Sequence, residues 1–206
     1  NELLFTPEIK EKQTEQKEFV VSCEGLSVNE VERRVISSYI KGYTIIKLIC
    51  TDQSKSKTLR NVLNNLVALE IIAQTKNSLV AKDFLNLADI SITDTIRRID
   101  LLVRDMIEDS IASLGKNINF NLDERDDDVN KFCFLGYRIT RKVMNDPNLA
   151  KLLKTNNNEI MDFYWLITNL ESIGDETKRI PRYVKNLSVK DKNELIKIYR
   201  KYKKII

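Results

Sequence analysis

Apolar residues recur at steps of three and four near the end of the chain, in the stripe Ile160, Phe163, Ile167, Leu170 and Gly174. This spacing is typical of an amphipathic α-helix with one buried face. Because 206 residues contain only five glycines and three prolines, long helices are expected. The pattern predicts a mainly α protein with an antiparallel helical bundle over 58–206, whose helices lie near 58–80, 91–115, 120–146, 157–185 and 189–205.

The first fifty residues carry a different pattern. Residues rich in β-branched side chains over 18–23 and 43–50 predict two strands. Between them, Ser27 and Glu30 have the spacing of a capping box at the start of a helix. This strand-helix-strand unit predicts a small α+β lobe over residues 1–54, placed before the bundle.

Glu171 lies on the apolar stripe of the predicted fourth bundle helix. It follows Ile167 by four residues, and Asp175 lies one turn further along the same side. An unpaired buried carboxylate is costly, so the group is expected to have a partner. Two kinds of partner are open at this point, an arginine of a neighbouring helix or a metal ion.

A second acidic residue borders the stripe of the predicted third bundle helix. Asp126 precedes Cys133 by seven residues, and Asn130 lies one turn further on. The helix dipole also favours acidic residues in a first turn, which is the simpler explanation for the acidic cluster as a whole. If the third and fourth helices are neighbours, Asp126 and Asn130 face Glu171 and Asp175 across an oxygen-lined site.

The segment Leu69-Glu70-Ile71-Ile72 resembles Leu170-Glu171-Ser172-Ile173. Glu70 follows Leu66 by four residues, so on a helix it too would face the apolar seam. The pattern therefore predicts a duplicated helix with an inward glutamate in each copy. Gln74 stands where the second copy has Asp175, which predicts that the first copy is the weaker ligand.

The composition excludes several function classes. The chain has no histidine, which removes His-based acid/base catalysis, Ser-His and Cys-His nucleophiles, and most zinc and haem sites. Any metal must therefore be held mainly by oxygen ligands. The net charge of +4 comes from 34 basic and 30 acidic side chains, which is a mixed surface and not a nucleic-acid footprint.

The cysteines and the apolar runs bear on location. Cys23, Cys50 and Cys133 are widely spaced and form no CxxC motif, which predicts reduced thiols in a cytoplasmic protein. No run approaches the roughly 18 apolar residues that span a bilayer, so no membrane span is expected.

At its acidic motifs the sequence resembles the archaeal type of the PhoU family of phosphate-uptake regulators. The family's D-x-x-x-D motif is similar to Asp126-x-x-x-Asn130, and its L-E-R-I-[GA]-D motif is similar to Leu170-Glu171-Ser172-Ile173-Gly174-Asp175. The resemblance covers nearly the whole chain, including Gly42-Tyr43, Leu69-Glu70-Ile71-Ile72, Arg97-Arg98 and the run from Arg125 to Phe132. Asn130 replaces the family's second acid, and Ser172 replaces a basic residue.

The resemblance implies a PhoU-like three-helix repeat that binds metal. Bacterial relatives hold multinuclear iron or other metal clusters at these motifs, which implies a divalent metal or iron at Asp126, Glu171 and Asp175, with Asn130 in the place of the second acid. Archaeal members carry an AbrB-like DNA-binding domain before the strand-helix-strand lobe. Residues 3–7 resemble the end of that domain, so DNA binding is expected only through an upstream domain outside this chain.

The expected function is therefore that of a non-enzymatic regulator of phosphate uptake and phosphate homeostasis. It would act in the cytoplasm as a homodimer, binding metal and phosphate-transport or signalling proteins. One alternative is a carboxylate-bridged di-iron enzyme of the ferritin-like type, whose usual Glu-x-x-His ligands this chain lacks. Another is a metal-free helical interaction module, in which the inward acids pair with Arg97, Arg98 or Arg138.

Overall fold

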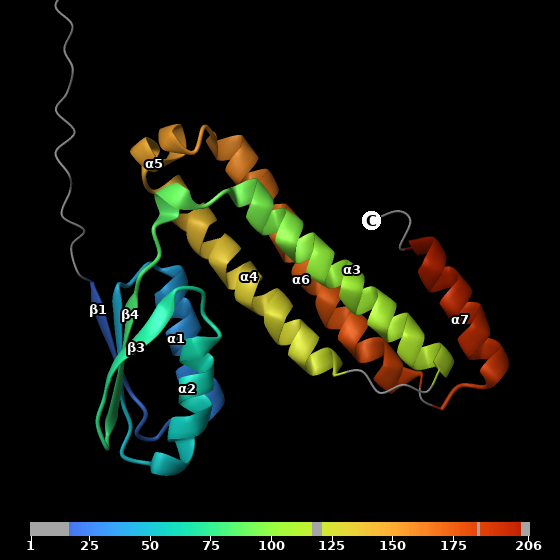
Figure 1. Ribbon diagram of the computed structural model, residues 1–206, viewed down its shortest axis with the longest axis horizontal. Coiled ribbons are helices and arrows are strands. Elements are labelled where there is room, and N and C mark those ends of the chain that lie inside the picture. Colours follow the sequence, from blue (N-terminus) through green and yellow to red (C-terminus); the bar gives the residue numbers. More distant parts are fainter. Residues whose placement is uncertain (1–16, 117–120, 185, 203–206) are drawn as a thin grey trace, which may run out of the picture.

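The computed structural model describes residues 17–116, 121–184 and 186–202. It consists of a four-stranded sheet with two helices, followed by a bundle of three long helices (Figure 1). The expected fold class, a mainly α protein with a small α+β lobe before a helical bundle, is confirmed. None of the helices in the described part of the chain has the length and apolar character needed to cross a bilayer.

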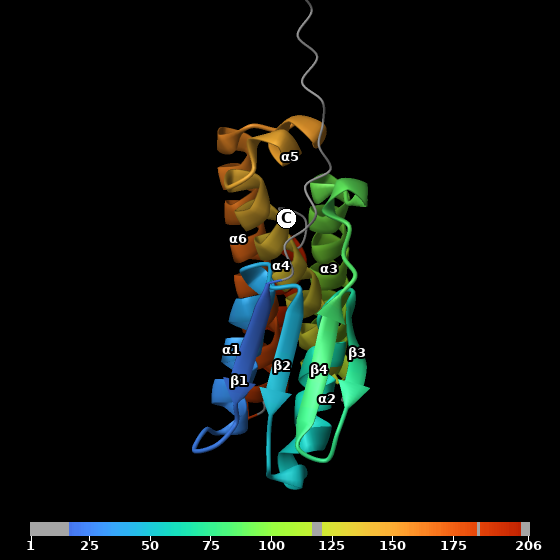
Figure 2. The same ribbon diagram turned by 90° about the vertical axis from the view of Figure 1, so that its left-hand side faces the viewer.

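The lobe is built around a mixed sheet with the strand order β1-β2-β4-β3. β1 and β2 are parallel and are joined by α1, while β4 is antiparallel to both β2 and β3. Figure 2 shows the strands side by side, with α1 and α2 behind them. The elements are β1 Glu18–Ser22, α1 Val28–Ile40, β2 Ile45–Ile49, the 3₁₀ turn η1 Gln53–Lys55, α2 Ser56–Asn64, β3 Leu69–Gln74 and β4 Ser78–Asp83.

The predicted strand-helix-strand unit is confirmed, and so is its cap. The Ser27 side chain accepts a hydrogen bond from the Glu30 amide, and the Glu30 carboxylate accepts one from the Ser27 amide at 2.8 Å. These two bonds satisfy amides that have no partner inside α1. Gly42 follows the helix at φ +80°, a conformation that glycine adopts without strain.

The predicted helix over 58–80 is wrong. α2 ends at Asn64, and the chain then forms the β3–β4 hairpin. The α+β lobe therefore continues to Asp83, beyond the expected boundary at residue 54. Glu70 lies on β3 opposite Lys82 and is exposed, so the prediction of a second helix with an inward glutamate is wrong as well.

The bundle helices lie close to their predicted positions. α3, α4 and α6 pack against one another in pairs, and α7 packs against α3. The predicted helices over 91–115, 120–146, 157–185 and 189–205 are confirmed, with ends that differ by one or two described residues. Residues 117–120, 185 and 203–206 lie outside the described residues. The elements are the 3₁₀ turn η2 Leu87–Asp89, α3 Ile92–Lys116, α4 Leu122–Met144, α5 Pro147–Leu152, α6 Asn157–Tyr183 and α7 Val189–Tyr202.

Close packing between α4 and α6 depends on glycine at position 136. A Cβ built at Gly136 would lie 2.6 Å from Cδ1 of Ile167, a side chain with no exposed surface. At Gly174, on the facing helix, the nearest atom to such a Cβ is Cγ1 of Val129 at 3.5 Å, an ordinary contact. The missing side chain at Gly136 therefore permits the approach of the two helices that carry the predicted site residues.

The cysteines differ from the prediction of reduced thiols. Cys23 and Cys50 form a disulfide, with their Cα atoms 5.0 Å apart. The parallel pairing of β1 with β2 brings them together, since each cysteine follows the end of its strand and the Cys23 amide donates to the carbonyl of Ile49. Cys133 is a free, buried thiol in the bundle.

Candidate functional site

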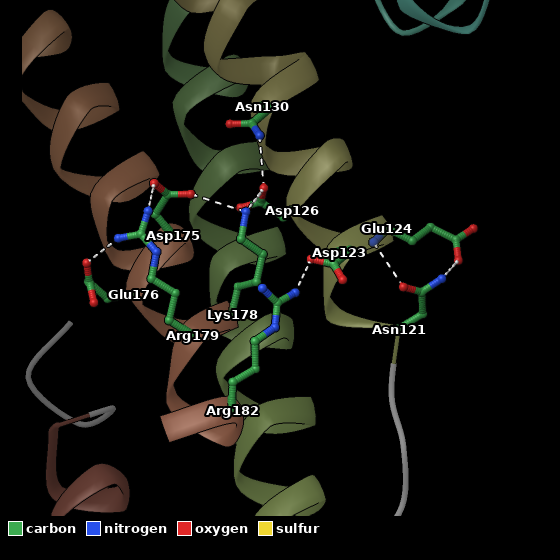
Figure 3. Close-up of polar contacts among 10 residues, drawn as sticks. All are labelled: Asn121, Asp123, Glu124, Asp126, Asn130, Asp175, Glu176, Lys178, Arg179 and Arg182. Carbon is green, nitrogen blue, oxygen red and sulfur yellow. Dashed lines mark hydrogen bonds and ion pairs between the residues drawn. The ribbon is translucent and has the colours of Figure 1, made fainter. Parts of the chain in front are cut away.

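The candidate site lies where the first turns of α4 face the last turns of α6 (Figure 3). Asn121 caps α4 by accepting a hydrogen bond from the Glu124 amide, which fixes where the helix begins. Asp126 then falls on the face that packs against the other helices, and it is only 5% exposed. Its neighbour Asp127 is exposed, as its position away from the apolar stripe predicts.

Asp126 has two donors within hydrogen-bond distance. The ammonium of Lys178 on α6 lies 2.5 Å from Oδ2, and the side-chain amide of Asn130 donates to the same oxygen at 3.1 Å. A buried carboxylate is tolerated when it is paired and hydrogen-bonded in this way. The buried carboxylate of Asp126 therefore has a cationic partner, the ammonium of Lys178.

Lys178 also reaches the second predicted acid. Its ammonium lies 3.4 Å from Oδ1 of Asp175, one turn earlier on α6. Figure 3 shows the Lys178 side chain between the two carboxylates. Burial acts to lower the pKa of Lys178, but the hydrogen bond and charge of Asp126, and then those of Asp175, outweigh it and raise that pKa. One ammonium therefore pairs with acids from two helices.

Further ion pairs extend this arrangement along the seam. Arg179 contacts Asp175 at 3.0 Å and Glu176 at 2.6 Å, both within α6. Arg182 crosses to Asp123 on α4 at 2.5 Å, although both side chains are exposed. Exposed pairs of this kind contribute little to stability, so the Lys178 contacts dominate the electrostatics of the site.

Glu171 occupies a separate position in the same α4–α6 seam. Its carboxylate accepts a hydrogen bond from the hydroxyl of Tyr137 on α4 at 3.0 Å. Burial first, and then the charges of Glu171 and Asp126, raise the pKa of the buried Cys133 thiol on α4. The structure therefore brings Asp126 and Asp175 to one ammonium and holds Glu171 beside Tyr137.

Two of the three arginines named as possible partners make other contacts. Arg138 pairs with Asp83 of the lobe, and Arg98 lies over the ring of Phe132 at 5.5 Å. Sequence reasoning missed Lys178 and Tyr137 as partners. The signal for Lys178 was present, since it follows Asp175 by three residues and so lies on the same face of the helix.

The donor types at the site suit a hard cation. Asp126, Asn130, Glu171 and Asp175 offer carboxylate and amide oxygens, the ligands that such ions prefer. An ion bound there would have to displace Lys178, because Oδ2 of Asp126 already accepts from Lys178 and Asn130. Within the described residues, no three acidic, cysteine or histidine side chains are gathered so as to hold a metal ion.

Comparison of the chain with family models, with curated proteins and with solved structures finds no match.

Proposed function

We propose that this chain is a non-enzymatic regulator of phosphate uptake and phosphate homeostasis, of the kind found in the PhoU family. The proposal is supported by the two acidic motifs, which resemble that family and which face each other on α4 and α6. The observation that carries it is the contact of Lys178 with both Asp126 and Asp175 at the seam of these helices. We propose that it acts as a homodimer. The cytoplasmic location expected from reduced thiols is not part of the proposal, because Cys23 and Cys50 form a disulfide.

The proposed action is a change in helix packing. Because Asp126 and Lys178 are largely buried, a partner that competes for either group alters the seam by about 1–3 kcal/mol per polar group left without its hydrogen bond. Phosphate-transport or signalling proteins that contact the bundle are the proposed partners. The packing of α1 against α4 would pass the change to the lobe, and from there to an upstream DNA-binding domain.

Metal binding by Asp126, Asn130, Glu171 and Asp175 is a separate part of the proposal. A divalent metal or iron would compete with the ammonium of Lys178 for Oδ2 of Asp126. Calorimetric titration with Mn²⁺ or Fe³⁺ tests this. We expect the Lys178→Met variant to bind the ion more tightly than the wild type, and a further Asp126→Asn change to abolish the gain.

A metal-free helical interaction module is the second candidate. It is favoured by the partners that the predicted ligands already have, since Asp126 and Asp175 contact Lys178 and Glu171 contacts Tyr137. The titration separates the two candidates, because this module predicts no saturable ion binding by either the wild type or the Lys178→Met variant.

The regulatory role is tested in cells that lack the chain. Phosphate uptake is measured at high and low external phosphate, with wild-type chain or variants restored. We expect the wild type to restore control of uptake and Asp126→Asn to fail. Asp127→Asn is the matched control, because this neighbouring acid is exposed. Uptake that is identical with and without the chain would contradict the proposal.

A further inference from the structure

A groove of about 390 Å³ opens between α1 of the lobe and α4 of the bundle. Its apolar lining consists of Ile36, Ile40 and Phe134, which are partly buried against the core of the lobe. The volume falls in the range of pockets that hold small ligands. The groove lies far along α4 from Asp126, and it shares no lining residue with the candidate site.

Three cations surround this apolar lining. Arg33 and Lys41 come from α1 and the residue after it, and Arg141 comes from the last turn of α4. No acidic side chain lines the groove, and none of the three cations is within ion-pair distance of an acid in the described residues. By contrast Lys142, which is next to Arg141 in the sequence, lies 3.7 Å from Asp146.

We propose that this groove binds a small amphiphilic anion, with its apolar body against Ile36, Ile40 and Phe134 and its phosphate or carboxylate group held by the three cations. Guanidinium groups hold such oxygens through paired, charge-assisted hydrogen bonds. The apolar lining supplies a surface that gains from being removed from water. A purely hydrophilic anion would leave the apolar lining exposed to water. A neutral amphiphile would leave the three cations without an anion.

The position of the groove gives binding a structural consequence. Its cations come from both the lobe and the bundle, so an anion that contacts Arg33 and Arg141 together joins the two units. A ligand shared between two packed units stabilises the arrangement that allows both contacts. The inference uses none of the residues of the Asp126 site and does not depend on the proposed phosphate-regulating role.

The test is calorimetric titration of the 206-residue chain with monomeric octyl phosphate. We expect saturable binding of one molecule per chain, with shifts of the Ile36 and Ile40 methyl resonances that locate it. The Arg33→Gln/Arg141→Gln variant should bind about tenfold more weakly or worse, because two charge-assisted contacts are lost. The matched control is Arg34→Gln/Lys142→Gln, which removes the same charge from neighbouring exposed positions and should bind like the wild type.

Three further probes decide the chemistry of the ligand. Octyl glucoside and inorganic phosphate should bind at least about tenfold more weakly than octyl phosphate, because each lacks one of the two features that the groove recognises. Equal binding of octyl glucoside would overturn the proposal, as would equal losses in both double variants. Binding to anionic lipid vesicles without binding to monomeric octyl phosphate would also overturn it, since a membrane surface would then be the partner.

Discussion

The guanidinium of Arg138 on α4 donates a hydrogen bond to the carboxylate of Asp83, the last residue of β4, and each side chain is 5% exposed. The same guanidinium lies 4.5 Å from the ring centroid of Tyr39. The hydroxyl of Tyr39 donates a hydrogen bond to the Val67 carbonyl. Burial raises the pKa of Asp83, and the charge of Arg138 acts against that rise. This pair links the lobe to the bundle electrostatically.

Breaking this pair should cost more than replacing it. Asp83→Leu leaves a buried guanidinium without its anion, so the free energy of unfolding should fall by about 3–5 kcal/mol. The double variant Asp83→Leu/Arg138→Met leaves no unpaired charge and should be more stable than Asp83→Leu alone. Urea unfolding of Asp83→Leu, Arg138→Met and the double variant measures the coupling free energy between the two side chains. Strictly additive losses would contradict the buried pair.

Lys178 should stabilise the bundle in a pH-dependent manner. Removing the ammonium by Lys178→Met leaves Asp126 with only Asn130, a loss of about 3 kcal/mol. The folded-state pKa of Lys178 is raised above its ordinary value of 10.5, so its contribution is complete below that pH. The contribution is lost as the pH rises through the folded-state pKa.

Urea unfolding of the wild type and Lys178→Met at a series of pH values tests this dependence. The difference between them should be constant near neutral pH and should shrink above about pH 10.5. Lys190→Met, which changes an exposed lysine on α7, is the control and should leave stability unchanged. A difference that stays constant into strong alkali would show that the ammonium is not the stabilising group.

The two helix glycines at the α4–α6 contact should respond oppositely to alanine. Gly136→Ala places a methyl group 2.6 Å from Cδ1 of the buried Ile167, so stability should fall by about 1–3 kcal/mol. In Gly174→Ala the new methyl group lies 3.5 Å from Cγ1 of Val129, an ordinary contact. Stability should be unchanged or higher by up to about 1 kcal/mol, because alanine has a higher helix propensity than glycine. Ile167→Val removes Cδ1 and should rescue Gly136→Ala in thermal melts. Failure of that rescue would place the strain elsewhere.

The Cys23–Cys50 disulfide should stabilise the lobe. It joins residues 27 positions apart, and a loop of this length corresponds to about 3.5 kcal/mol. A reducing agent should therefore lower the melting temperature of the wild type but not of Cys23→Ser/Cys50→Ser. The Cys133→Ser variant keeps the disulfide and should still respond to reduction. Alkylation of all three thiols in untreated protein would contradict the bond.

The long helices were predictable because their signals are local. The stripe on α6 and the caps of α4 and α6 lie within the elements that they specify. The β3–β4 hairpin was missed for the opposite reason. Its run Leu69-Glu70-Ile71-Ile72 continues the apolar spacing of α2. The pairing of β3 with β4, and of β4 with β2, outweighs that local pattern. No feature of the neighbouring sequence indicates that Ala68, where the chain turns from α2 into β3, has a φ of +59°.

The candidate site was predicted in part. Spacing placed Asp126 beside a seam and Glu171 and Asp175 on the facing helix, and the structure puts all three between α4 and α6. Spacing alone could not show that the flexible side chain of Lys178 crosses to α4. It also could not distinguish an ammonium from a metal ion as the partner, because both satisfy the same carboxylates.

Apart from the Cys23–Cys50 disulfide, α4 takes part in each of the contacts on which these expectations rest. It supplies Phe134 to the lobe core, Arg138 to the pair with Asp83, Gly136 to the contact with Ile167 and Asp126 to Lys178. If this helix melts, the lobe loses its neighbour and the bundle loses one of its three long helices at the same time. Heat should therefore unfold the two units in one cooperative transition, with equal calorimetric and van't Hoff enthalpies, and two separable transitions would refute this coupling.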